Sequence, residues 1–210
     1  GQAELAHSVA LLLLPFVRNL IDGPTPLHLV EKPSPGTGAS LLVDVLVSPS
    51  IGRTLTTMTE GRDEDEWRKR ITAQLLTGVS AVVIDNIRQR LDSAAVSAVI
   101  TSTFWGDRRL GSSETIRVPV RCAWIATGNN PALSSEITRR TVRIRLDAKK
   151  DRPWLREGFR HPDLRSWAQE HRGELIHAAL TLGQAWLVAG KPAGQGPPFG
   201  MFESWSQTLG

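Results

Sequence analysis

The chain has 210 residues, of which 40% are hydrophobic, and a formal net charge of +4. This composition predicts a globular protein and excludes a disordered one, and the length suits one substantial core. The single cysteine, Cys122, excludes an internal disulfide and predicts a reducing, cytoplasmic environment.

The first predicted element is a helix over residues 2–20. Its apolar run from Leu11 to Leu14 is followed at once by Pro15 and Arg18. That pattern predicts a buried amphipathic helix, and we expect no membrane partner. Residues 27–31 form the next apolar run and predict a buried strand.

A glycine-rich loop follows this strand, with the sequence Pro35-Gly36-Thr37-Gly38-Ala39-Ser40. A strand, a glycine turn and a helix N-terminus together hold phosphate on backbone N–H groups. Such a P-loop normally ends Gly-Lys-Ser/Thr, because the lysine reaches the β- and γ-phosphates and the hydroxyl reaches Mg²⁺. Here Ala39 stands in place of the lysine. The alternative is an ordinary Pro/Gly turn.

Strands and helices continue to alternate after the loop. Strands are predicted at 53–58, 81–85, 122–127 and 141–146, and a β-hairpin at 104–120. Helices are predicted at 63–76, 93–101 and 134–139, with Asp63 and Ser93 as the caps of the first two. Strands that alternate with helices predict an α/β fold with a largely parallel sheet.

The character of the chain changes after Asp147. Residues 163–190 predict helices, and residues 190–200 are rich in proline and glycine. We therefore expect a nucleotide-binding core at 1–150 and a small helical region at 151–210, which we expect to be truncated.

Polar side chains close two of the predicted strands. Asp85 ends an apolar strand, and a carboxylate there can hold Mg²⁺ through its water shell. Asn86 follows, and an amide can orient water but cannot take its proton. Asn129 ends the next strand and would face the γ-phosphate. The alternatives are a turn cap for Asp85 and an Asx turn at Asn129.

Arginines gather late in the chain. Arg139 and Arg140 precede the last strand, where a guanidinium could stabilise transferring phosphate across a subunit boundary. From Arg139 to Arg172 basic residues outnumber acidic ones, which favours contact with a polyanion. The alternative for Arg139 and Arg140 is surface salt bridging. The alternatives for the whole basic segment are a solvated face, or arginines that face nucleotide in a neighbouring subunit.

The predicted hairpin combines aromatic and basic residues. Arg108, Arg109 and Arg117 could fix phosphates, and Trp105 could stack on a base, as in single-stranded nucleic-acid sites. The alternative is that Trp105 anchors the hairpin in the core, while the arginines pair with acids.

These motifs, in this order, resemble those of the AAA+ ATPases. More narrowly, the chain resembles the ATPase- or helicase-like module of phage, plasmid and integrative-element replication proteins, often found beside a primase domain. The resemblance covers roughly residues 25–190. It rests on the segments 32–42, 82–86, 107–111, 126–130 and 139–142.

The resemblance implies a three-layer P-loop domain with a central, mostly parallel sheet and a small helical region after it. It implies that ATP is held by Lys32, Pro35, Gly36, Thr37, Gly38, Ala39, Ser40 and Leu41, and Mg²⁺ by Ser40 and Asp85. It places Asp85, Asn86, Asn129 and the finger arginine, Arg139 or Arg140, in catalytic positions. The hairpin, with Trp105, Arg108, Arg109 and Arg117, resembles the insertion that touches DNA in ring helicases.

The implied function is a module of a mobile-element DNA replication protein that binds nucleotide weakly and binds single-stranded or forked DNA. A homo-oligomeric ring and a primase or helicase partner are implied with it. Ala39 and Asn86 depart from the family's lysine and glutamate, so enzymatic activity stays open, and the two departures together favour natural degeneration. The alternatives are an inactive scaffold for protein contact, such as helicase loading, and a DNA-binding module that uses no nucleotide.

Overall fold

The computed structural model describes residues 1–52, 55–108, 114–194 and 196–210. At its centre is a five-stranded sheet in the order β2-β3-β6-β1-β7, in which every neighbouring pair is parallel. Its strands are β1 (Leu27–Lys32), β2 (Thr57–Met58), β3 (Ala81–Ile87), β6 (Ala123–Asn129) and β7 (Thr141–Arg145). The prediction of an α/β fold with a parallel sheet is confirmed.

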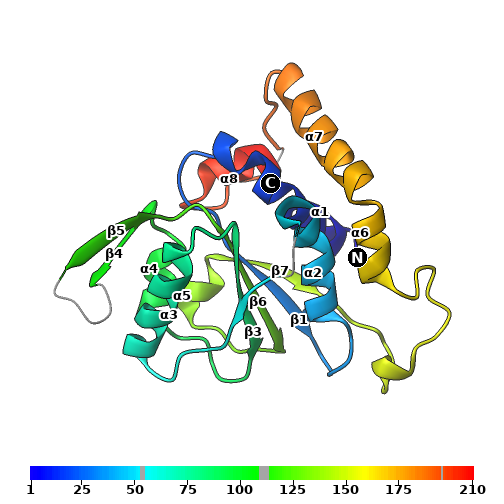
Figure 1. The fold of residues 1–210 in the computed structure, drawn as a ribbon, viewed down its shortest axis with the longest axis horizontal. Coiled ribbons are helices and arrows are strands. Elements are labelled where there is room, and N and C mark those ends of the chain that lie inside the picture. Colours follow the sequence, from blue (N-terminus) through cyan, green and yellow to red (C-terminus); the bar gives the residue numbers. More distant parts are fainter. Residues whose placement is uncertain (53–54, 109–113, 195) are drawn as a thin grey trace.

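Helices cover both faces of this sheet, which makes three layers (Figure 1). The helices are α1 (Gln2–Val17), α2 (Ala39–Ile51), α3 (Glu64–Leu76), α4 (Ala94–Val99), α5 (Ser135–Thr138), α6 (Leu164–Glu170), α7 (Arg172–Val188) and α8 (Glu203–Leu209). Short 3-10 turns occur at η1 (Arg18–Leu20) and η2 (Pro153–Leu155). The predicted hairpin is confirmed as β4 (Phe104–Arg108) and β5 (Thr115–Pro119), an antiparallel pair outside the central sheet.

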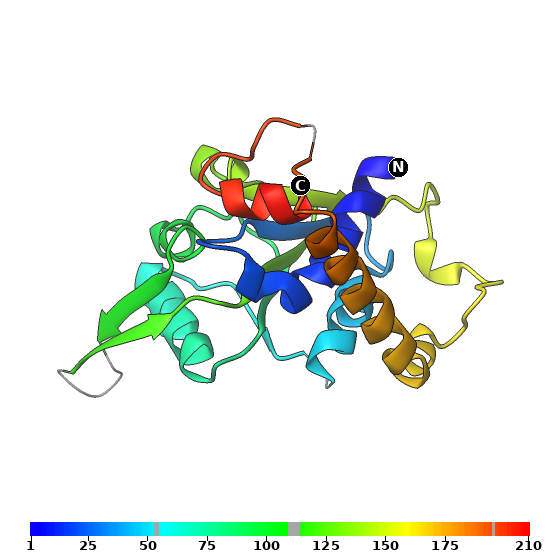
Figure 2. The ribbon, with the colours of Figure 1, turned by 90° about the horizontal axis from the view of Figure 1, so that it is seen from above.

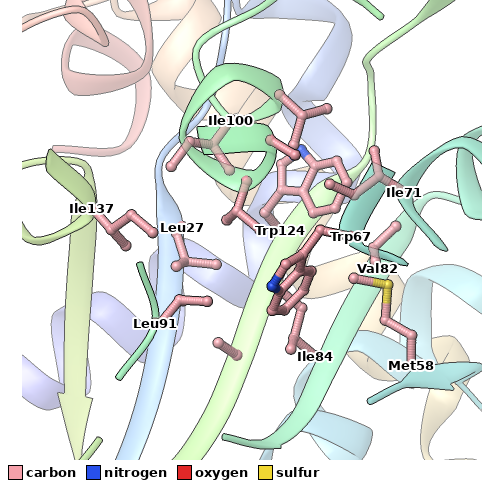
Figure 3. Packing of buried hydrophobic residues seen from close by; sticks show 14 of the residues in the cluster. Leu27, Met58, Trp67, Ile71, Val82, Ile84, Leu91, Ile100, Trp124 and Ile137 are labelled. Carbon is pink, nitrogen blue, oxygen red and sulfur yellow. The ribbon is translucent and has the colours of Figure 1, made fainter. Parts of the chain in front are cut away.

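Alternate residues of β1 face two separate hydrophobic clusters. Leu27 and Leu29 pack with α3, α4 and α5, and Figure 3 shows Trp124, Ile71 and Ile100 in this layer. Val30 packs with α1, α2 and α8 on the other face. Burial of each such aliphatic side chain stabilises the fold by about 1.5–3 kcal/mol. Both faces of the sheet are therefore held by apolar packing.

Side-chain caps fix where several helices begin. Asp63 accepts a hydrogen bond from the backbone N–H of Glu66 at the start of α3, and Ser93 accepts one from Val96 at the start of α4. Both caps were predicted. Ser134 caps α5 in the same way. Each cap contributes about 1 kcal/mol, because it satisfies a donor that the helix itself cannot.

The strand predicted at 53–58 is shorter in the structure. Residues 53–54 lie outside the described ranges, and Leu55 and Thr56 belong to no strand. Only Thr57 and Met58 pair with β3, at the edge of the sheet. β-branched composition signals a preference for extended backbone, but a partner strand must be in reach for pairing.

The predicted N-terminal helix is present as α1 and η1. Gln2–Leu20 is long and apolar enough to cross a membrane by length and composition alone. In the structure, however, Leu11, Leu14 and Val17 pack into the core beside the sheet.

The C-terminal helix α8 packs beside α1 in the same layer, as Figure 2 shows. Its Trp205 and the preceding Phe202 are buried in one cluster with α1, α2 and β7. The last residues therefore contribute to the main core. The boundary near residue 150 stays a prediction.

Candidate nucleotide and nucleic-acid sites

The parallel register brings three sequence motifs to one edge of the sheet. Lys32, the last residue of β1, lies opposite Asn129, the last residue of β6, and the backbone N–H of Asn130 donates to the Lys32 carbonyl over 3.0 Å. β3, which carries Asp85, is the neighbour of β6 on its other side. The glycine loop that leaves β1 thus starts beside Asp85 and Asn129.

The loop has the backbone of a tight turn into a helix. Gly36 and Gly38 have φ values of +75° and +98°, in the left-handed region that favours glycine. The Gly38 carbonyl accepts from the backbone N–H of Leu42 in the first turn of α2, and the Thr37 hydroxyl donates to the Ser34 carbonyl over 2.8 Å. Pro33 stands where the P-loop signature has its first glycine, a third departure that the sequence reasoning missed.

Ala39, the first residue of α2, is buried against the core directly after the loop. Its side chain is 1% exposed and packs in the cluster that contains Val43 and Val47. The lysine of a P-loop therefore has no counterpart at this position. Lys32, half-buried at the end of β1, is the cation nearest the loop in sequence.

A hydrogen-bonded triplet joins the loop to the two neighbouring strands. The Ser40 hydroxyl donates to Asp85 Oδ1 over 3.1 Å, and the Thr127 hydroxyl donates to the same oxygen over 2.7 Å. Thr127 is fully buried. The sequence reasoning gave Thr127 no role, although a hydroxyl in an otherwise apolar strand was the available signal.

The triplet fits a metal ion that arrives with phosphate. Mg²⁺ is commonly held by one or two carboxylates or hydroxyls, several waters and the phosphates themselves. Within the described ranges, no group of three or more His, Cys, Asp or Glu side chains could hold a metal. Ser40 and Asp85 therefore suit a shared Mg²⁺–phosphate site better than a site built from protein ligands alone.

Asn86 occupies a strained position directly after Asp85. Its φ is +57°, and the β3–β6 register shifts between Ile84 and Ile87 around it. Its backbone N–H donates to the Thr127 hydroxyl over 2.8 Å. Asparagine tolerates the left-handed region better than glutamate does. The backbone itself therefore favours asparagine here.

Trp154 of η2 packs against the glycine loop. A Cβ built at Gly36 would lie 3.0 Å from Trp154 Cβ and 3.2 Å from its Cε3. A side chain at Gly36 would therefore require Trp154 to move, at a backbone position whose φ of +75° already favours glycine. The segment after β7 therefore covers part of the loop, a placement that the sequence did not reveal.

The structure does not bring Arg139 and Arg140 to the glycine loop. Arg140 precedes β7, and its carbonyl accepts from Leu27 at the opposite edge of the sheet. Its side chain donates to Ser97 and Glu136 over 2.8 and 2.6 Å and is almost fully buried. The Arg139 side chain is 58% exposed and pairs with Glu136 over 2.5 Å. Of the two, Arg139 is the one with a free surface.

Several arginines of the basic segment 139–172 have internal partners. Arg143 and Arg145 each pair with buried Glu31 over 3.3 Å, and Arg165 pairs with Asp44 over 2.6 Å. These pairs reduce the positive charge that the segment presents to solvent. The pairing with Glu31, which lies just before the loop, was not foreseen.

The hairpin is anchored to α3 by its own tryptophan. Trp105 is 6% exposed, and its indole N–H donates to the Thr72 hydroxyl over 2.9 Å. Asp107 accepts from Thr72 over 2.9 Å and from Arg68 over 2.7 Å. Burial raises the pKa of the Asp107 carboxyl, but these hydrogen bonds outweigh it and leave the pKa below its ordinary value. A buried Trp105 has no face free to stack on a base.

Phe104 is the exposed aromatic of the hairpin instead. Its side chain is 48% exposed, and the guanidinium of Arg117 lies 4.0 Å from its ring centroid. Arg108 is exposed on the same hairpin. Arg109 lies outside the described residues. The hairpin therefore presents Arg117, as expected, beside an exposed aromatic that is Phe104 and not the expected Trp105.

A comparison with protein-family models found no match, and a comparison with curated proteins found none either. Solved structures of JCV helicase are distantly similar. One is 17% identical, with a TM-score of 0.39 over 70% of this chain and 44% of the helicase chain. A second, with a bound acetamide compound, is 16% identical, with a TM-score of 0.38 over 70% of this chain and 45% of the helicase chain. An inhibitor-bound form is 16% identical, with a TM-score of 0.35 over 85% of this chain and 51% of the helicase chain. This chain therefore spans about half the length of those helicase chains.

Proposed function

We propose that this chain is an AAA+-like module of a mobile-element DNA replication protein, which binds nucleotide weakly and also binds DNA. The observation that carries the nucleotide-binding part of the proposal is the triplet at the carboxyl edge of the parallel sheet. There Ser40 and Thr127 both donate to Asp85, beside a glycine loop that opens a helix. Open α/β sheets bind ligands at this edge.

Each part of the edge has a role in this proposal. Backbone N–H groups at the start of α2 would hold phosphate, because the helix N-terminus favours negative charge. Ser40 and Asp85 would hold Mg²⁺, which neutralises phosphate charge when it is bound. Thr127 keeps the Asp85 carboxylate in one orientation.

The same residues argue for weak binding and slow turnover. Ala39 supplies no charge to the phosphates, and loss of one electrostatic contact of this kind typically costs on the order of 10²–10³ in rate. Asn86 can orient a water molecule but cannot take its proton. We therefore expect a site that retains nucleotide better than it hydrolyses it.

A ring of subunits would explain the placement of Arg139. It lies at the edge of the sheet that is opposite the glycine loop, and its side chain is exposed. A residue there can reach only the site of a neighbouring copy. Arg140 is held by Ser97 and Glu136, so the proposal assigns the contact with the neighbour to Arg139.

Calorimetry with Mg-ATP tests the proposal, together with steady-state hydrolysis. We expect weak binding that Asp85→Ala abolishes and Asp92→Ala leaves unchanged, because Asp92 is an exposed carboxylate outside the triplet. We expect turnover far below about one per second, the lower end of typical enzymes. Turnover of about one per second that is lost in Asp85→Ala would contradict the proposal of a weak, slow site. Absence of any ATP binding would contradict the proposal that this chain binds nucleotide.

An inactive scaffold is the second candidate, and α7 favours it. Leu180, Leu182, Leu187 and Val188 are 54%, 54%, 39% and 82% exposed on this helix, which projects from the body in Figure 1. Exposed apolar side chains on one helix suit protein contact, here with a primase or helicase partner. A chain that binds neither Mg-ATP nor single-stranded DNA would favour this reading.

A further inference from the structure

A polar cavity lies at the edge of the sheet that is remote from the glycine loop. It has a volume of about 210 Å³ and is lined by the end of α1, the turn from Gly78 to Ser80, and Arg121 and Ala123 at the start of β6. Arg18 and Arg121 both line it. A water molecule takes about 30 Å³ of liquid volume, so a small ion and several waters would fit.

Arg18 brings a buried positive charge to this cavity. It is 9% exposed, and its guanidinium donates to the carbonyls of Ile21, Gly23 and Val120 over 3.1, 2.9 and 3.2 Å. Carbonyls satisfy N–H groups but carry no full negative charge. Three of the five guanidinium N–H groups are used in this way, and the buried Nε has no partner among the described residues.

Arg121 adds a second positive charge beside the first. It is exposed, and its Nη1 donates to the Asn19 side-chain carbonyl over 3.2 Å. Burial lowers the pKa of Arg18, and the charge of Arg121 lowers it further. Among the described residues, no ion pair joins either arginine to a carboxylate. Two guanidinium groups thus share a cavity, and neither forms an ion pair with a carboxylate of the described residues.

We propose that this cavity binds a phosphate group between Arg18 and Arg121. A buried charge without compensation is costly, and a dianion would neutralise both arginines where one carboxylate would not. The planar guanidinium fork matches phosphate oxygens. The proposal does not depend on the nucleotide site, because the cavity lies at the amino edge of the sheet and the glycine loop at the carboxyl edge.

The phosphate could be free or part of a nucleic-acid backbone. Val120, whose carbonyl binds Arg18, directly follows the hairpin strand β5, so the cavity lies at the base of the hairpin. Backbone phosphate and free phosphate present the same oxygens to the two arginines. The two sources differ in what Arg121 does to DNA affinity.

Calorimetry with inorganic phosphate at low salt tests the site. We expect Arg121→Ala to weaken phosphate binding about tenfold or more, since a hydrogen bond to a charged group is of that magnitude. Arg121→Lys should restore only part of it, because lysine keeps the charge but loses the fork. Arg90→Ala is the matched control, an exposed arginine outside the cavity. Arg18 is left intact because it ties three carbonyls together.

The effect of Arg121→Ala on phosphate and DNA binding tests the site and distinguishes its two possible ligands. Absence of phosphate binding in the parent chain, or binding that Arg121→Ala leaves unchanged, would overturn the proposal, the latter by placing phosphate elsewhere. Loss confined to inorganic phosphate would support the site with a free phosphate as its ligand. If Arg121→Ala also lowers affinity for a single-stranded oligonucleotide, with a shallower salt dependence, the site serves backbone phosphate. Neither result bears on Mg-ATP binding at Ser40 and Asp85.

Discussion

Ala39 is the residue on which the proposed weakness of the glycine-loop site depends. It is 1% exposed and supplies neither charge nor donor to a bound phosphate. Its position, directly after Gly38 and at the start of α2, is where the P-loop signature has lysine. The phosphate site that we propose therefore lacks the cation that the P-loop signature supplies.

Ala39→Lys should strengthen ATP binding about tenfold or more, because a charged hydrogen bond to phosphate is added. Ala39→Met is the size-matched control without charge, and it should leave affinity unchanged. Both should lose about 1–3 kcal/mol of stability in urea, since each overpacks a filled position. Equal ATP affinity in all three proteins would mean that the loop does not hold phosphate.

Asn86→Glu should lower stability by about 1–2 kcal/mol, because glutamate is disfavoured at the φ of +57° that this position has. Asn86→Gly is the control, and it should be as stable as the parent because glycine adopts this backbone without strain. We expect Asn86→Glu to add little hydrolysis while Ala39 remains. A glutamate variant of parental stability with fast turnover would contradict this account of the bulge.

The attachment of the hairpin to α3 decides which of its side chains are exposed. Hydrogen bonds of Trp105 and Asp107 with Thr72 hold β4 against α3, so one face of the strand packs on the core. Side chains alternate along a strand, and Phe104 therefore points away from that anchor. The exposed face carries Phe104 with Arg117 beside it.

Phe104→Ala should weaken binding to single-stranded DNA by about 1–3 kcal/mol with little change in salt dependence, since stacking releases few ions. Arg117→Ala should weaken binding and also reduce the slope of log affinity against log salt by about 0.7. Fluorescence anisotropy at several salt concentrations measures both.

Trp105→Ala provides the contrast to these two variants. Because its indole is buried, we expect a loss of about 3–5 kcal/mol of stability. If Trp105→Ala folds and loses more DNA affinity than Phe104→Ala does, then Trp105, and not Phe104, stacks on the bases.

At the scale of the whole molecule, α8 closes the layer that α1 and α2 begin. Trp205 of α8 meets His28 of β1 edge to face, with ring centroids 5.9 Å apart. His28 is fully buried, and burial lowers its pKa to about 4, with the charge of His7 as a smaller cause. The packing of the last helix thus keeps a histidine neutral in the core.

Acid should therefore destabilise the fold through His28. Its unfolded-state pKa is near 6.5, so the stability contributed by the neutral ring is present above pH 6.5 and is lost as the pH falls towards 4. Between pH 7.5 and pH 4.5 the loss should be about 2–3 kcal/mol. Urea unfolding of the parent and of His28→Leu across this range measures it. Parallel curves for the two proteins would show that His28 does not titrate on unfolding.

Much of the fold followed from local patterns. Apolar runs such as 27–31 and 81–85, and caps such as Asp63 and Ser93, predicted elements whose existence depends mainly on nearby residues. Strands that alternate with helices also predicted the parallel sheet. The order of the motifs then brought the loop, Asp85 and Asn129 to one edge, because parallel strands all end there.

Tertiary structure decided which faces are free. Trp105 and Arg140 are buried while Phe104 and Arg139 are exposed, and each pair consists of adjacent residues of like type. Sequence spacing cannot separate such neighbours, because packing against α3 or α5 selects between them. The sequence by itself determined the elements and the residues available at each strand end. Contacts between distant segments, such as those of Thr127 with Asp85 and of Arg18 with Val120, form only when long-range packing brings the elements that contain these residues together.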